Sequence, residues 1–241
     1  MQQIDEILTR MPDAGYWLIL AISLFLSIST GAYVKKTYAK FGSVPVSSGV
    51  TANDFAQKML RDNGIYDVAL AHTSGELTDN YNHRALTLSL SDSTYGKSSV
   101  AAVGVAAHEA GHAVQYKKRY LPVLLRSGMA GVVNVGSNLG LILAVVGSLF
   151  NSSFGDALIT VGLVLYSAVF LFTLVTLPVE FNASRRAISA ARGSGFFSSS
   201  ELAGMRSVLT AAALTYVASM TVALLNLLRM ISIFGTGRRR N

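Results

Sequence analysis

The sequence of 241 residues contains no cysteine. Disulfide bonds are therefore excluded, and so are thiolate ligands, which leaves nitrogen and oxygen donors for any metal site. Charged residues are also scarce: they make up 14% of the chain, whereas a soluble domain carries about 25%. Hydrophobic residues make up 51% of the chain. This composition is typical of a membrane protein.

The hydrophobic residues are concentrated in four long stretches, which cover residues 16–33, 128–150, 154–177 and 208–234. Because about 20 apolar residues cross a bilayer as a helix, we expect about four transmembrane helices. The first stretch does not resemble a cleaved signal peptide. A signal peptide begins with positive charge, but this stretch is preceded by Asp5, Glu6 and Asp13 against only Arg10.

The net charge is +7, and many of the basic residues lie beside the apolar stretches. Ten of the basic residues follow the first stretch, precede the second or follow the third: Lys35, Lys36, Lys40, Lys117, Lys118, Arg119, Arg126, Arg185, Arg186 and Arg192. Since such residues collect on the cytoplasmic side of spanning helices, we expect residues 34–127 and 178–207 in the cytoplasm. Four spans would leave the arginines at 238–240 outside, against this rule. Either a short basic tail is tolerated outside, or residues 208–234 are not a simple span. Nucleic-acid binding is not indicated, because the charge is juxtamembrane and lacks an aromatic-studded patch.

Residues 108–112 read His-Glu-Ala-Gly-His inside an apolar run. Histidines four residues apart lie on the same face of a helix, so His108 and His112 could bind one zinc ion per chain. Glu109 would then lie beside the metal, where it can take a proton from an activated water molecule. An ordinary helix does not explain why two of only four histidines flank a glutamate at this spacing. A structural zinc site in a membrane scaffold would give Glu109 no purpose.

The segment before this motif predicts a small α+β domain. Thr51 can cap a helix that ends at Asn63-Gly64, and residues 65–72 predict a strand. Residues 84–91 alternate strictly, with Leu86, Leu88 and Leu90 on one face, which indicates a half-buried strand.

This second strand comes shortly before the motif, where many zinc peptidases have an edge strand. An extended substrate can pair with such an edge through its backbone. Thr87, Leu88 and Ser89 are therefore candidate substrate-binding residues, although a purely structural strand fits the pattern equally well.

A catalytic zinc site needs a third protein ligand and an open position. The upstream candidates are His72, His83, Asp79 and Asp92, and downstream Glu201 is better placed to cap a helix. Glu180 differs because it lies at the end of the third apolar stretch, where an acid is costly unless it is paired or liganded. Pro178 can begin a new helical segment there. The alternative is that Glu180 pairs with Arg185 or Arg186.

Several segments together carry a resemblance to a known family: Gly-Ile-Tyr-Asp-Val from Gly64, Gly-Glu-Leu-Thr-Asp-Asn-Tyr from Gly75, Ala-Leu-Thr-Leu-Ser from Ala85, and residues 106–115 and 177–187. In these the chain resembles the YugP-like neutral zinc metallopeptidases, small membrane proteases of bacteria. The resemblance implies that His108, His112 and Glu180 are zinc ligands and that Glu109 is the base. A looser similarity links the chain to HtpX-like peptidases, which have an aspartate where this chain has Ser184. The loop with Asn80, Asn82 and His83 also departs from the family pattern, which often has His, Asp and Pro near these positions.

Two other families with this motif fit less well. FtsH-type proteases need a nucleotide-binding Gly-x-x-x-x-Gly-Lys-Ser/Thr loop, which this sequence lacks. Site-two-type proteases place the motif inside a spanning helix, whereas the apolar run here is short for a span.

We therefore expect a mainly α membrane protein, with about four transmembrane helices and a small α+β zincin-like catalytic domain built from the motif helix and an edge strand. The expected parts are an N-terminal transmembrane helix (1–34), a cytoplasmic catalytic region (35–127), a transmembrane hairpin (128–177), a third-ligand helix and loop (178–207), and a C-terminal apolar helix with a basic tail (208–241).

The expected function is that of a gluzincin-like zinc metalloendopeptidase. We expect a multi-pass protein of the cell membrane whose substrates are proteins or peptides, membrane proteins among them. Ser184 and Arg185 are candidates for orienting the zinc ligands through hydrogen bonds to the ligand side chains. The donor that stabilises the oxyanion stays open among Tyr81, Tyr95, His83 and Arg185.

Overall fold

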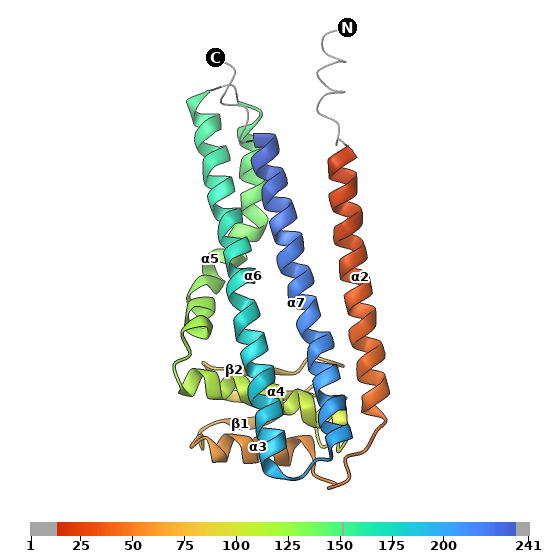
Figure 1. Ribbon diagram of the computed structural model, residues 1–241. Helices are drawn as coiled ribbons and strands as arrows, with labels where there is room; N and C mark the ends of the chain where they lie inside the picture. The colour runs from red at the N-terminus through yellow and green to blue at the C-terminus, as the bar shows by residue number, and fades with distance from the viewer. Residues whose placement is uncertain (1–13, 151, 235–241) are drawn as a thin grey trace. The chain divides into compact units, whose positions relative to one another are not determined.

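The computed structural model describes residues 14–150 and 152–234, and most of them are helical (Figure 1). The elements in chain order are α2 (Ala14–Gly42), α3 (Ala52–Asp62), β1 (Ala69–Thr73), β2 (Asn80–Asn82), β3 (Thr87–Ser91), α4 (Val100–Lys117), α5 (Leu121–Gly147), α6 (Ser153–Ser194) and α7 (Ser199–Phe234). The chain divides into two compact units. One unit comprises residues 30–128 and 175–216 and contains the sheet and the His-Glu-Ala-Gly-His motif. The other is formed by residues up to 29, residues 129–174 and residues from 217 onward.

Three of the described helices, α2, α6 and α7, are long and apolar enough to cross a membrane. They qualify over Trp17–Gly42, Ser153–Ser194 and Ser199–Phe234. Helix α5 is bent between Leu121–Asn134 and Leu139–Gly147, and its two parts qualify only when they are taken together as one span. The structure therefore confirms three of the expected spans by length and composition and leaves the fourth as a prediction. The basic tail at 238–240 lies outside the described residues.

Helix α6 runs without interruption through Pro178. The prediction that Pro178 begins a new helical segment is therefore wrong. A proline inside a helix removes one backbone donor, but Val179 and Ala183 just after it are buried, and this packing holds the helix together. Glu180 consequently lies on the same helix as the third apolar stretch.

The sheet has the strand order β1-β3-β2, with β1 parallel and β2 antiparallel to β3. The prediction that β3 is an edge strand is thus wrong. Thr87, Leu88 and Ser89 pair with β1 on one side and with β2 on the other. No backbone edge is left there for a substrate strand, so the argument that made these three residues substrate-binding fails. Leu88 and Leu90 are fully buried as expected, whereas Leu86 lies in the preceding turn with φ 49° and is exposed.

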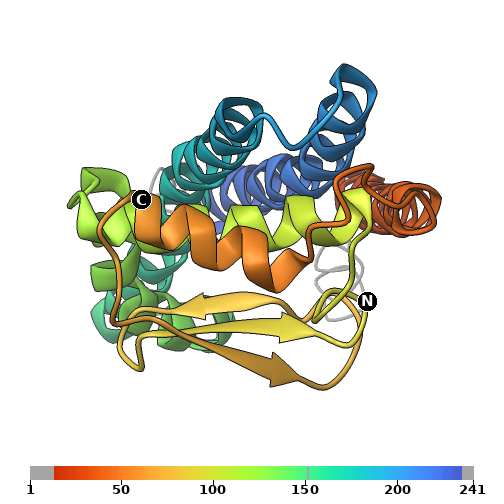
Figure 2. The same ribbon diagram turned by 90° about the horizontal axis from the view of Figure 1, so that it is seen from below.

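Helix α4 is the centre of the motif-bearing unit, and Figure 2 shows α3 and α4 side by side over the three strands. The predicted cap of α3 is confirmed, because the Thr51 hydroxyl accepts a hydrogen bond from the Asp54 amide. Ser99 caps α4 in the same way. These caps satisfy amide groups that the first turn of each helix would otherwise leave unpaired.

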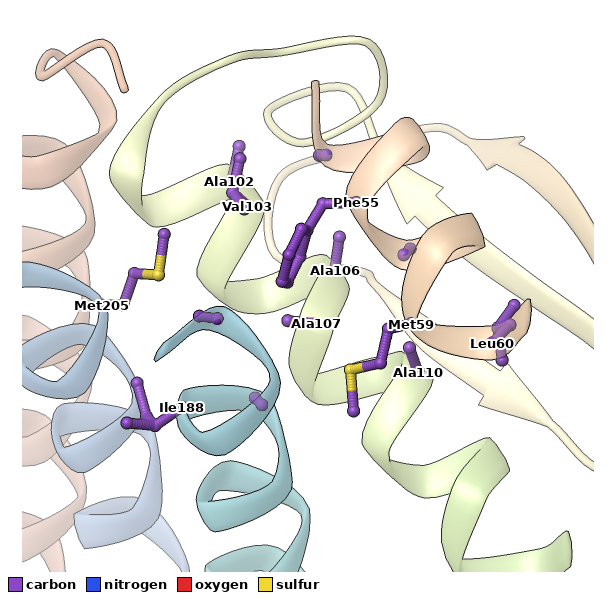
Figure 3. Close-up of a cluster of buried hydrophobic side chains, with 14 of the residues drawn as sticks. Phe55, Met59, Leu60, Ala102, Val103, Ala106, Ala107, Ala110, Ile188 and Met205 are labelled. Atoms are coloured by element: carbon purple, nitrogen blue, oxygen red, sulfur yellow. The ribbon is translucent and has the colours of Figure 1, made fainter. Parts of the chain in front are cut away.

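The core between these helices depends on small side chains of α4. In Figure 3, Phe55 and Met59 of α3 point toward Ala106 and Ala110 of α4. Alanines one turn apart leave a shallow surface into which the larger side chains of α3 fit. The apolar run around the motif therefore serves a packing role on the face of α4 that its histidines do not occupy.

Candidate metal centre

His108 and His112 lie one turn apart on α4, with their ring centroids 4.7 Å apart. A donor atom of each, together with one carboxylate oxygen of Glu109, lies within 4.8 Å of the others. The helical spacing predicted from the sequence thus brings two imidazoles and a carboxylate together. Such a group could hold a metal ion.

Glu180 of α6 faces the same two histidines. Its Oε2 atom lies 3.1 Å from Nε2 of His108 and 3.5 Å from Nε2 of His112. The side chain is only 2% exposed, and its other oxygen, Oε1, accepts a hydrogen bond of 2.8 Å from Arg126. The alternative pairing with Arg185 or Arg186 does not occur in the described structure. Arg186 donates to Asn182 instead, and Arg185 is exposed.

The Nδ1 atom of each imidazole ring, on the side away from Glu180, also has a hydrogen-bond partner. The Nδ1 atom of His108 lies 3.1 Å from the Ser184 hydroxyl, and that of His112 lies 3.0 Å from Oε1 of Gln115. Gln115 in turn donates to the carbonyl of Val179 on α6. Both rings therefore turn their Nε2 atoms toward Glu180, as metal-binding histidines do when a second group fixes Nδ1.

The structure places the two residues predicted to orient the ligands in different surroundings. Ser184 contacts His108 as expected. Arg185 is exposed and lines a separate cavity between α6 and α7. Gln115 and Arg126 belong to the site but were not predicted from the sequence. Gln115 is three residues after His112 on the same helix, so its contact with that histidine could have been predicted from the spacing. Nothing near Arg126 in the sequence points to Glu180.

Gly111 explains how α6 comes so close to the histidines. A Cβ atom at this position would lie 2.8 Å from the carbonyl oxygen of Ala183. Real side chains do not tolerate such a contact, so the glycine allows the backbones of α4 and α6 to meet. The fourth residue of the motif thus positions Glu180 and Ser184.

A cavity of about 200 Å³ opens onto this centre. His108 and Glu109 of α4 line it, and so do Asp79 from the loop before β2 and Tyr216 of α7. Burial raises the pKa of the Glu109 carboxyl, while the charges of His112 and His108 act in the opposite direction. A raised pKa suits a carboxylate that must accept a proton near neutral pH.

The other candidate ligands have different partners. His72 pairs with Asp92 at 2.6 Å, and His83 stacks on Tyr116. Both oxygens of Asp79 accept hydrogen bonds from Ser91. Glu201 accepts a hydrogen bond from the Ser198 amide and caps α7, as its position after three serines predicts. Of the acids weighed as a third ligand, Glu180 is the one that the structure brings to both histidines.

The family described as "Putative neutral zinc metallopeptidase" matches residues 16–235 of the chain. The chain belongs to this family. A protein of Bacillus subtilis (strain 168), named "Putative membrane protease YugP", is 41% identical over 219 residues, which are 91% of this chain and 96% of that protein. No solved structure matches the chain.

Membership of this family implies zinc, and the residues of the centre fit that metal. Zinc takes imidazole nitrogen and carboxylate oxygen ligands, and catalytic sites commonly combine two histidines with one glutamate. The chain offers this donor set from α4 and α6, with an open cavity at Glu109. Together with the apolar helices, the family places the protein among the membrane-associated zinc peptidases.

Proposed function

We propose that the protein is a membrane-embedded zinc-dependent endopeptidase. The observation that carries this proposal is the convergence of His108, His112 and Glu180 around one point, with Glu109 beside it at the end of a cavity. A purely structural zinc site would be closed by four ligands. An open cavity beside the buried carboxylate of Glu109 instead favours catalysis.

The mechanism follows from the position of each side chain. His108, His112 and Glu180 would hold the zinc ion, while Ser184 and Gln115 keep the imidazoles turned toward it. Zinc held there would polarise the scissile carbonyl and lower the pKa of a water molecule toward neutrality. Glu109 accepts the proton of the attacking water and then passes it to the leaving amine nitrogen. The substrates that we propose are proteins or peptides, membrane proteins among them.

Removal and return of zinc test this function. We expect chelator-treated protein to lose its ability to digest casein and to recover it when about one equivalent of Zn²⁺ is added, because a site with three protein ligands holds one ion. Mg²⁺, which prefers all-oxygen octahedral sites, is the control and should restore nothing. Full activity after complete zinc removal would overturn the proposal.

Tyr216 is the donor that we propose for the oxyanion formed during hydrolysis. It lines the cavity beside His108 and Glu109. Of the residues considered from the sequence, Tyr95 instead packs on His72, and Tyr81 and His83 pack on Tyr116. We expect Tyr216→Phe to lower kcat roughly 10²-fold with zinc content unchanged, as for the loss of an oxyanion donor. Tyr95→Phe is the matched control, and an unchanged kcat in Tyr216→Phe would exclude this role.

We also propose that the motif-bearing unit faces the cytoplasm, because most of the basic residues that flank the long apolar stretches belong to this unit. Ser48 and Ser152 are both exposed and lie on opposite sides of the membrane in this topology. In a chain that lacks cysteine, a cysteine at Ser48 should react with an impermeant thiol reagent only after the membrane is permeabilised. A cysteine at Ser152 should react in intact cells. The reverse pattern would show that the orientation is inverted.

A further inference from the structure

A second cavity, of about 420 Å³, lies between α6 and α7 within the motif-bearing unit. We call it the α6–α7 cavity. Its basic lining consists of Arg185, Arg192 and Arg206, and its apolar lining includes Phe181, Leu209 and Ala213. The proposed peptidase chemistry does not use these arginines.

The three arginines are exposed, and within residues 14–150 and 152–234 none of them is paired with an acid. No aspartate or glutamate lines the cavity either. Three guanidinium groups that share one cavity without a counter-charge create a strongly positive site. Arginine is also suited to bind phosphate through two parallel hydrogen bonds. The charge therefore points to an anionic ligand with oxygen acceptors.

The lining changes character along the two helices. Phe181 lies four residues after the third apolar stretch ends at Leu177, whereas Arg192 lies 11 residues further on, about 16 Å along a helix. Helix α7 runs back toward its own apolar stretch, so Arg206 comes first and Ala213 follows two turns later. Arg192 and Arg206 thus lie at the end of the cavity away from the long apolar stretches, whereas Arg185 lies one turn from Phe181.

We propose that the α6–α7 cavity binds an anionic phospholipid. The phosphate of the lipid contacts the arginines, and the first part of an acyl chain lies against Phe181 and Leu209. Inorganic phosphate would use the arginines but not the apolar end, where Phe181 remains 46% exposed. Basic pockets between helices at the cytoplasmic side of a membrane meet anionic headgroups, and such a leaflet supplies these lipids at high concentration.

The test uses the full-length protein purified in detergent and offered equal amounts of phosphatidylglycerol and phosphatidylcholine, after which the lipids that stay bound are counted by mass spectrometry. We expect wild-type protein to retain phosphatidylglycerol at least about tenfold over phosphatidylcholine, since each basic residue near an anionic headgroup strengthens binding several-fold. The triple variant Arg185→Gln, Arg192→Gln, Arg206→Gln should lose this preference. Arg192→Gln alone should lose part of it.

The matched control removes the same charge elsewhere, through Arg61→Gln, Arg84→Gln and Lys117→Gln, which are exposed positions outside the cavity. This variant should keep the preference of the wild type. The proposal is overturned if the two triple variants bind lipid equally. Equimolar inorganic phosphate or acidic peptide should leave the bound phosphatidylglycerol in place, because neither has an acyl chain to lie against Phe181 and Leu209; displacement at equimolar concentration would also overturn the proposal. Since the readout is bound lipid, the result does not depend on peptidase activity.

Discussion

The Glu109→Gln variant is expected to fold and bind zinc like the wild type but to digest casein roughly 10²–10⁴-fold more slowly. Glutamine has nearly the same shape as glutamate, so the packing of α4 changes little. It cannot accept the proton of the attacking water, however, and the reaction loses its general base. The side chain is 9% exposed and lines the cavity beside His108, where the attacking water would be bound.

Glu76→Gln is the matched control for this variant, because it makes the same change at an exposed glutamate. Its rate should equal that of the wild type. Zinc content and thermal unfolding are measured on both variants, so that a loss of metal or fold is separated from a loss of chemistry. Turnover retained in Glu109→Gln with zinc bound would show that another group is the base.

Glu180→Ala is expected to weaken zinc binding by more than roughly 100-fold, because groups that only support a ligand already contribute about 10–100-fold. The change removes the carboxylate oxygen that lies within 3.5 Å of both His108 and His112 at Nε2. It also leaves the guanidinium of Arg126 without its partner beside the metal. Both effects disfavour a cation at this position.

Glu201→Ala separates this effect from the loss of a buried carboxylate in general. Glu201 is 8% exposed and caps α7, but its partners are Ser47 and Ser198 rather than the histidines. We expect this variant to lose stability by about 0.5–2 kcal/mol, as for other caps, and to keep its zinc affinity. Glu180→Asp should recover zinc binding only in part, because its carboxylate is drawn back by one methylene. Equal zinc affinity in Glu180→Ala and wild type, in a competition titration with a chelator, would remove Glu180 from the ligand set.

The features that could be predicted from the sequence are those set by local spacing. The histidines of the motif share a helix face because they are four residues apart, and Thr51 and Glu201 cap helices because each lies at the start of a helical segment. Ser184 was predicted beside the ligands because it lies one turn after Glu180, and it contacts His108.

The features that escaped prediction depend on long-range packing. The parallel pairing of β1 with β3 joins segments on either side of β2, and no local pattern in residues 84–91 distinguishes a central strand from an edge strand. Arg126 reaches Glu180 from α5, and Tyr216 lines the cavity from α7, which are both distant in the sequence from the motif. Pro178 is tolerated because of packing around α6. Each of these depends on contacts that only the folded chain defines.

The central claim is that His108 and His112 hold a zinc ion, and elemental analysis of purified protein tests it most directly. The account predicts about one zinc per chain in the wild type and its loss in both His108→Ala and His112→Ala, since the chain has no cysteine to substitute for either imidazole. His72→Ala, which alters a histidine paired with Asp92 outside the centre, should keep its zinc. Full zinc occupancy in both His108→Ala and His112→Ala would contradict the account.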